Sequence, residues 1–204
     1  LMLETTEHTS SYYAASKNWQ TDYPVLKGEH QCDVAILGGG FTGVSAALRL
    51  IQHGYKVAIV EANRISWGAS GRNGGQLIDG FVNDLYKLEK KIGKKGTQIA
   101  YQMGIECRDL VLERIKKYSI DCDLRFGFLD VAMNQGDIDD FHEWIEEKEK
   151  NNYPHKMEFI PKERLHEHIG SERYIAGVVN YGNGHLHPIN LCIGEARAVT
   201  EQGG

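Results

Sequence analysis

The chain has 204 residues, of which 41% are hydrophobic and 25% charged, as in an ordinary globular protein. Its formal net charge of −5 argues against double-stranded nucleic acid as a partner, and no apolar run approaches the roughly 20 residues of a membrane span. The four cysteines show neither a metal-ligand nor a disulfide spacing, so we expect a reduced, cytoplasmic protein without a metal centre.

The first part of the chain predicts an N-terminal arm followed by a βαβ unit. Residues 1–30 are polar and aromatic by turns, which is typical of an arm. CDVAIL (32–37) and KVAIVEA (56–62) are aliphatic runs that predict strands buried on both faces. Between them, GGGFTG opens a helical pattern, VSAALRLIQHG, which ends at Gly54. Strand, glycine turn, helix and strand within about 30 residues indicate a βαβ unit.

The middle of the chain changes from helical to extended patterns. We expect one helix near 80–92 and a longer one over 97–119. An extended segment at 125–134 follows, and Asp137 then caps a charged helix. Pro161 opens a further short helix.

The last part of the chain predicts a strand and a helix. Residues 174–187 read as a strand with a turn, and an amphipathic helix begins at Pro188 and ends just before Gly203. A helix packed on a parallel sheet normally leads to another strand, whereas this sequence stops. We therefore expect a fragment, or a shortened form, of a larger α/β protein.

A G-x-G-x-x-G pattern lies between the first strand and the first helix, at Gly38, Gly40 and Gly43. In a dinucleotide-binding turn these glycines serve, in order, the tight turn, the approach of backbone amides to a pyrophosphate, and close helix–strand packing. The helix N-terminus near Phe41 and Thr42 would face the anion, and Glu61 would accept hydrogen bonds from ribose hydroxyls. The alternative is a turn whose glycines serve packing alone.

The stretch GASGRNGGQ (68–76) distinguishes FAD from NAD as the dinucleotide. A glycine-dense loop can run its backbone along a flat ring with amide donors directed at it, as the isoalloxazine ring requires. Asn73 would donate and accept hydrogen bonds, and Arg72 would offset the charge of pyrophosphate or of the reduced flavin. Arg72 could instead brace the loop, and the whole stretch could be a flexible surface turn.

Together, DVAILGGGFTGVSAALRL, GYKVAIVEA and WGASGRNGG resemble the N-terminal half of the FAD-dependent oxidases of the D-amino-acid oxidase and sarcosine oxidase type. Within this family, the lead-in from Ser11 joined to GASGRNGGQ is most similar to gamma-glutamylputrescine oxidases. The resemblance implies a Rossmann-type, α/β FAD-binding domain with a parallel sheet, plus part of an α+β substrate domain. The residues that it places at the cofactor are Gly38, Gly40, Phe41, Thr42, Gly43, Glu61, Ala62, Arg64, Ser70, Arg72, Asn73, Gly74, Gly75 and Gln76.

The resemblance also implies a division of the chain and a chemistry. Residues 1–30 would be an arm, 31–122 and 175–204 a discontinuous, incomplete FAD-binding domain, and 123–174 the start of the substrate domain. FAD would be held non-covalently, since no histidine lies between His53 and His142 to tether it.

The expected reaction is oxidation of the C–N bond of a small-molecule amine or amino acid, gamma-glutamylputrescine or a similar compound, with reduction of dioxygen to hydrogen peroxide. No residue is assigned a catalytic role. Two alternatives stay open: a non-catalytic cofactor-binding fragment that needs a missing C-terminal half or second chain, and an NAD-dependent dehydrogenase.

Two histidines, His185 and His187, lie two residues apart near the end of the chain. On one strand face they would suit a metal or the flavin edge, but no third ligand lies nearby, so we expect a turn or cap role.

Overall fold

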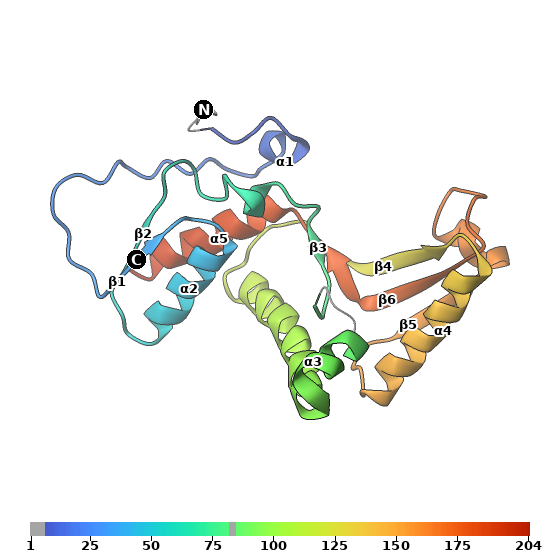
Figure 1. Cartoon of the computed structure of the whole chain (residues 1–204). Coiled ribbons are helices and arrows are strands. Elements are labelled where there is room, and N and C mark those ends of the chain that lie inside the picture. The colour runs from blue at the N-terminus through green and yellow to red at the C-terminus, as the bar shows by residue number, and fades with distance from the viewer. Residues whose placement is uncertain (1–6, 82–84) are drawn as a thin grey trace. The chain divides into compact units, whose positions relative to one another are not determined.

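The computed structural model describes residues 7–81 and 85–204, which form two compact units (Figure 1). The first unit contains the chain up to Gly75, Asp79–Leu124 and the chain from Leu186 onward, and the second contains Gln76–Ile78 and Arg125–His185. These boundaries differ from the predicted domains, because residues 176–185 pair within the sheet of the second unit.

The first unit is a βαβ unit with further helices. Its elements are α1 (Tyr12–Ala15), β1 (Val34–Leu37), α2 (Phe41–Gln52), β2 (Val57–Val60), the 3₁₀ helix η1 (Ala69–Gly71), α3 (Leu85–Lys117) and α5 (Pro188–Glu201). Strands β1 and β2 are parallel, with Val34 opposite Val57 and Leu37 opposite Val60. The predicted βαβ unit is confirmed.

The prediction that both strands are buried on two faces is wrong. One face of the β1–β2 pair, with Ile36 and Ile59, packs against the core of the first unit. On the other face, Leu37 is 90% exposed and Val60 40% exposed. The described chain covers one face only, because α2 contacts these two strands and α5 packs against α2.

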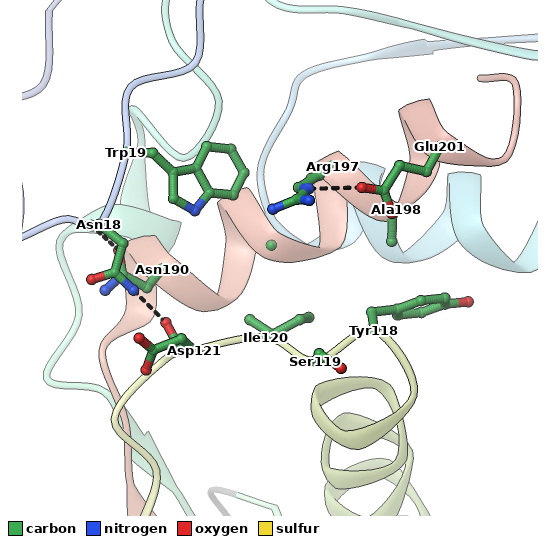
Figure 2. Close-up of a pocket in the computed structure, with 11 residues that line it drawn as sticks. Asn18, Trp19, Tyr118, Ser119, Ile120, Asp121, Asn190, Arg197, Ala198 and Glu201 are labelled. Atoms are coloured by element: carbon green, nitrogen blue, oxygen red, sulfur yellow. Dashed lines mark hydrogen bonds and ion pairs between the residues drawn. The ribbon is translucent and has the colours of Figure 1, made fainter.

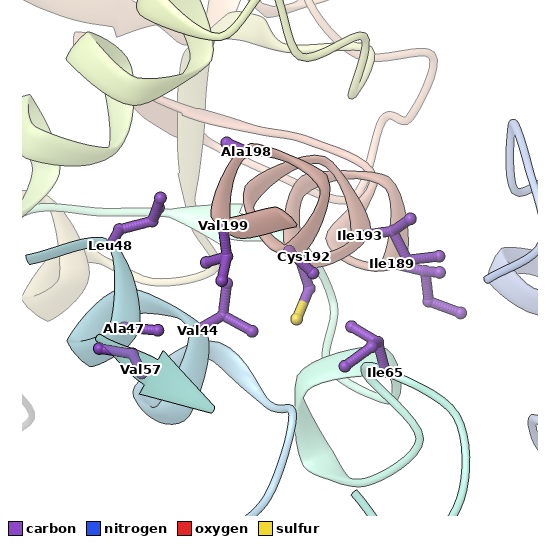
Figure 3. Packing of buried hydrophobic residues seen from close by; sticks show 11 residues of the cluster. Val44, Ala47, Leu48, Val57, Ile65, Ile189, Cys192, Ile193, Ala198 and Val199 are labelled. Carbon is purple, nitrogen blue, oxygen red and sulfur yellow. The ribbon is translucent and has the colours of Figure 1, made fainter. Parts of the chain in front are cut away.

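The core of the first unit lies between α2 and α5. Figure 3 shows the side chains of Val44 and Val199 directed toward one another, with Cys192 and Ile65 nearby. Burying such side chains contributes about 1.5–3 kcal/mol each. This packing fixes α2, and with it the glycine turn that precedes the helix.

Helix α3 contains the two predicted helical segments. They meet at Gly93, whose φ of 69° and ψ of 171° are not helical. Part of the start predicted near residue 80 falls on 82–84, outside the described residues.

The second unit is an antiparallel sheet flanked by α4. Its elements are β3 (Gln76–Leu77), β4 (Arg125–Ala132), α4 (Gln135–Lys150), β5 (Met157–Pro161), the 3₁₀ helix η2 (Lys162–Glu167) and β6 (Ala176–His185). Strand β6 is central and pairs with β4, β5 and β3. Gly127, with a φ of 96°, marks an irregularity in the β4–β6 ladder.

Three local predictions in this unit need correction. Strand β6 runs without the predicted turn, because it pairs with β4 and β5 along its length. A Cβ at Gly184 would lie 2.1 Å from the carbonyl oxygen of Arg125, so this glycine serves close packing. The N-cap of α4 is Asn134, and Asp137 completes a capping box with it. Pro161 ends β5 and precedes η2, which is a 3₁₀ helix.

Candidate cofactor-binding site

The glycine turn (residues 38–43) joins β1 to α2, and sterics require glycine at its ends. Gly38 has a φ of 102°, in the left-handed region. A Cβ at Gly43 would lie 2.1 Å from the carbonyl oxygen of Gly38, so only glycine lets the helix approach the strand this closely. At Gly40, a Cβ would lie 2.8 Å from Ser70 Oγ.

The first turn of α2 presents backbone amides. Phe41 N–H donates to Ser70 Oγ at 2.9 Å. The N–H groups of Thr42 and Gly43 have no acceptor within residues 7–81 and 85–204. The helix dipole adds positive charge here, so an anion such as a pyrophosphate would find both donors and a favourable field.

Glu61 follows β2 and connects it to the glycine turn. Its Oε2 accepts from Gly39 N at 2.6 Å, and its Oε1 accepts from Asn63 N at 3.0 Å. Each carboxylate oxygen has a further lone pair with which to accept from a hydroxyl group. Ala62, the next residue, is exposed. The carboxylate thus lies at the turn, as the dinucleotide hypothesis requires.

Cys192 of α5 supports the turn from the core side. Its thiol lies 3.7 Å from the carbonyl oxygen of Gly39, to which it donates. Burial raises the pKa of this thiol to about 12, so it stays protonated and unreactive near neutral pH.

The glycine-rich loop (residues 68–75) contains two glycines that packing requires. A Cβ at Gly71 would lie 2.2 Å from the carbonyl oxygen of Ser66. Gly75 has a φ of 71°, and a Cβ there would lie 2.1 Å from the carbonyl oxygen of Leu186. Leu186 N–H also donates to Gly75 O at 2.8 Å. Part of the glycine content therefore serves the approach of one backbone to another.

Side chains of the same loop brace it internally. Asn73 Nδ2 donates to Ala69 O and Ser70 O, and Asn73 Oδ1 accepts from Gly75 N. Arg72 Nε donates to Trp67 O at 3.0 Å, and the guanidinium carbon lies 4.3 Å from the centre of the Trp67 ring. Arg72 therefore makes the contacts expected of a residue that braces the loop.

Arg64, a predicted cofactor residue, is bound by the N-terminal arm. Its guanidinium pairs with the carboxylates of Glu7 and Asp22 and donates to Thr21 O. Hydrogen bonds to Glu7 and then Asp22 raise the pKa of Arg64. Gln76, also a predicted cofactor residue, lies in β3 of the second unit, opposite His185 of β6.

His187 is the N-cap of α5, as the cap hypothesis expected. Its Nδ1 accepts from Asn190 N at 3.2 Å, so Nε2 carries the proton toward Ser16 Oγ, also 3.2 Å away. Burial lowers the pKa of His187 below its usual 6.5. Within the described residues, no cluster of three or more metal-ligating side chains occurs.

A surface cavity of about 220 Å³ lies elsewhere in the first unit (Figure 2). It is lined by Asn18 and Trp19 of the arm, the segment 118–121 after α3, and residues of α5. Asn18 bridges the first two by donating from Nδ2 to Asp121 O at 2.7 Å. No predicted cofactor residue lines this cavity.

Sequence reasoning missed the partners that hold the site together. One of these residues is Gly39, which packs so closely that a Cβ there would lie 2.4 Å from Ile65 Cδ1. The arm residues that bind Arg64 and the glycine-rich loop were also missed. The alternating polar and aromatic pattern of the arm was visible, but it did not indicate which segment the arm contacts.

Comparison with known proteins identifies the family. Residues 33–204 match the family described as DAO, FAD dependent oxidoreductase, and the chain belongs to this family. It is 42% identical over 200 residues to gamma-glutamylputrescine oxidoreductase of Escherichia coli (strain K12), across 98% of this chain and 46% of that protein. Both the predicted family resemblance and its similarity to this group are confirmed.

Solved structures support the same fold. Glycine oxidase from Bacillus cereus superposes with a TM-score of 0.62 and 25% identity, over 85% of this chain and 45% of that one. A form of L-amino acid deaminase from Proteus vulgaris superposes with a TM-score of 0.69 and 22% identity, over 98% of this chain and 49% of that one. The predicted α/β fold is confirmed, and the chain spans about half the length of these relatives.

Two further expectations concern the cofactor and the absence of a membrane span. FAD is the cofactor named for the family, which leaves the NAD alternative without support. Among the described residues, no helix is both long and apolar enough to cross a membrane.

Proposed function

We propose that this chain binds FAD non-covalently and forms part of an oxidoreductase that oxidises the C–N bond of an amine resembling gamma-glutamylputrescine. The similarity to the Escherichia coli gamma-glutamylputrescine oxidoreductase supports this substrate class. When bound, FAD supplies the electron acceptor for the amine, and reduction of dioxygen to hydrogen peroxide completes the proposed reaction.

The observation that carries the proposal is the pair of amides at the start of α2 that have no acceptor in the described part of the chain. Thr42 and Gly43 N–H would donate to the pyrophosphate, and Ser70 Oγ lies beside them on Phe41 N. Glu61, already bound to Gly39 N, would accept from the ribose of the adenosine. These donors and this acceptor support the assignment of the turn to the pyrophosphate and the adenosine ribose.

The glycine-rich loop is the proposed neighbour of the flavin ring. Ser70, Arg72, Asn73 and Gly74 lie on this loop, and Arg72, Asn73 and Gly74 are exposed. An exposed backbone with few side chains would allow close approach by a flat ring. The bracing by Asn73 would keep that backbone in one conformation.

A non-catalytic cofactor-binding role is the second candidate. Two observations favour it. The chain spans 46% of the length of the Escherichia coli protein. In addition, Leu37, on the uncovered face of β1, is 90% exposed. In that case the chain would bind FAD but would need further polypeptide for turnover.

One experiment distinguishes these roles. The chain is titrated with FAD, followed by quenching of flavin fluorescence, and the loaded chain is mixed with gamma-glutamylputrescine, putrescine and glycine while peroxide is measured. Saturable one-to-one FAD binding with peroxide from the acylated amine supports the oxidase. FAD binding without peroxide supports the binding role, and absence of FAD binding contradicts both.

A further inference from the structure

The N-terminal arm contacts the beginning of the segment that contains the glycine-rich loop. Trp67 Nε1 donates to Glu7 O at 2.7 Å, and His8 Nε2 donates to Ile65 O at 3.0 Å. The Glu7 and Asp22 carboxylates bind Arg64, three residues before Trp67. The arm and the segment 64–67 that leads into the loop are therefore joined by bonds between residues 42–60 positions apart in the sequence.

The same arm contacts the end of the loop. Tyr13 OH donates to Gly74 O at 3.1 Å. The Tyr13 ring lies edge-on to His187, with ring centres 5.1 Å apart, and Ser16 Oγ accepts from the same histidine. Since Leu186 N–H donates to Gly75 O, this end of the loop is held between the arm and the start of α5.

The internal hydrogen bonds of Asn73 leave the loop without a buried apolar anchor, so contacts from outside add to its support. Of residues 68–75, only Gly71 and Gly75 are buried, and neither has an apolar side chain to anchor the loop. Glycine also has more conformational freedom to lose on ordering than any other residue. Hydrogen bonds from the arm at both ends offset that loss.

We propose that the N-terminal arm is a positioning segment of the cofactor site, with Tyr13 anchored on the glycine-rich loop and Glu7 anchored on the segment 64–67 that leads into it. The proposal rests on the proposed function, because it assigns the ordered loop to the FAD site. Tyr13 and Glu7 act through the loop and need not touch the cofactor themselves.

The main test compares Tyr13→Phe with Tyr12→Phe. Both variants lose one hydroxyl from α1, but the Tyr12 side chain is 76% exposed and its hydroxyl forms no hydrogen bond within the described residues. Hydrogen–deuterium exchange is measured on the whole chain without FAD. In Tyr13→Phe, exchange across residues 68–75 should rise about threefold to tenfold, as expected for one lost hydrogen bond. Exchange in α2 should stay at the parent value in both variants.

A second pair of variants tests the other anchor. Glu7→Gln weakens the ion pair with Arg64, whereas Glu29→Gln makes the same charge change at an exposed position of the arm. Exchange across residues 64–67 should rise in Glu7→Gln alone. Equal exchange in Glu7→Gln and Glu29→Gln, or in Tyr13→Phe and Tyr12→Phe, would overturn the proposal.

FAD binding then tests whether the ordered loop belongs to the cofactor site. Tyr13→Phe should weaken FAD affinity about threefold to tenfold and change the visible circular dichroism of the bound flavin, and Tyr12→Phe should do neither. Faster loop exchange with parental FAD affinity and spectrum would overturn the assignment of the loop to the site. If the parent chain itself binds no FAD, the proposed function fails, while the exchange data still decide whether the arm orders the loop.

Discussion

The glycine turn and the glycine-rich loop use the same residue for different physical reasons. In the turn, Gly43 lets α2 lie close to β1, and the amides of Thr42 and Gly43 have no acceptor among the described residues. In the loop, Asn73 and Arg72 use theirs on neighbouring backbone. The conformation of the turn is thus set by backbone sterics, whereas the loop is an exposed segment held by side-chain hydrogen bonds.

Gly43→Ala should have the largest effect, because it removes the steric basis of the turn. The new Cβ would lie 2.1 Å from Gly38 O, and backbone cannot move aside as a flexible side chain would. We expect the free energy of unfolding to fall by about 1–3 kcal/mol in urea titrations. FAD affinity should fall about a hundredfold, since two amide bonds to a charged group are worth about 1.5 kcal/mol or more each.

Gly170→Ala is the matched control for this variant. A Cβ at Gly170 meets no atom within 4 Å, and the residue lies in the second unit. Its FAD affinity and stability should equal those of the parent chain. Parental FAD affinity in Gly43→Ala would show that the turn does not hold the pyrophosphate.

Glu61→Gln should have the next largest effect. The amide group keeps the size of the carboxylate, but its NH₂ would face either Gly39 N–H or Asn63 N–H, both of which are donors. We expect a loss of about 1 kcal/mol in unfolding free energy and a roughly tenfold loss in FAD affinity, measured by urea titration and fluorescence quenching. Glu29→Gln, with an exposed side chain, should change neither quantity.

Acidification should loosen the support of the loop. Burial lowers the pKa of His187 below 6.5, the nearby Asp123 carboxylate opposes this shift, and Tyr13 and Ser16 contact the ring. The unfolded chain therefore binds the proton more readily than the folded chain. Stability from this group is complete above about pH 6.5 and decreases as pH falls below it.

His187→Asn isolates this effect, because asparagine is a good N-cap that does not titrate. We expect the urea midpoint of the parent chain to fall more steeply than that of the variant between about pH 6.5 and pH 5. Identical pH profiles would mean that protonation of His187 is not coupled to folding.

The difference between the glycine turn and the glycine-rich loop also explains how much of the structure the sequence could predict. The turn was predictable because Gly38, Gly40, Gly43 and Glu61 act through local βαβ geometry, which places them together in any such unit. The N-cap role of His187 was likewise predictable, because its partner Asn190 is three residues away.

Features set by distant contacts were not predictable. Tyr13 meets Gly74 across 61 positions, and no periodic pattern encodes such a pairing. The aliphatic run of β1 indicated a strand, but the exposure of Leu37 depends on what covers the sheet. Residues 174–187 suggested a strand with a turn, whereas Gly184 allows the close approach of Arg125, and the sequence alone does not distinguish these roles of glycine.

Arg72 should give the smallest effect and the sharpest distinction between the two interpretations of the loop. Arg72→Lys keeps the charge but loses the Nε bond to Trp67 O and the planar stacking on the Trp67 ring. Bracing predicts a loss of about 0.5–1 kcal/mol in unfolding free energy for this exposed contact. Arg49→Lys on α2, where the arginine bonds only to Gln52 at 3.5 Å within the described residues, is the control.

FAD titrations of Arg72→Lys and Arg72→Gln then separate charge from shape. If Arg72 acts as a brace, both variants lose similar stability and similar FAD affinity, because lysine and glutamine alike lack the guanidinium group that lies on Trp67 and its Nε–H. If its charge acts on the cofactor instead, Arg72→Lys keeps parental affinity and Arg72→Gln does not. The bracing contacts lead us to expect the first result, which would mean that the loop offers its backbone, rather than a cation, to the flavin.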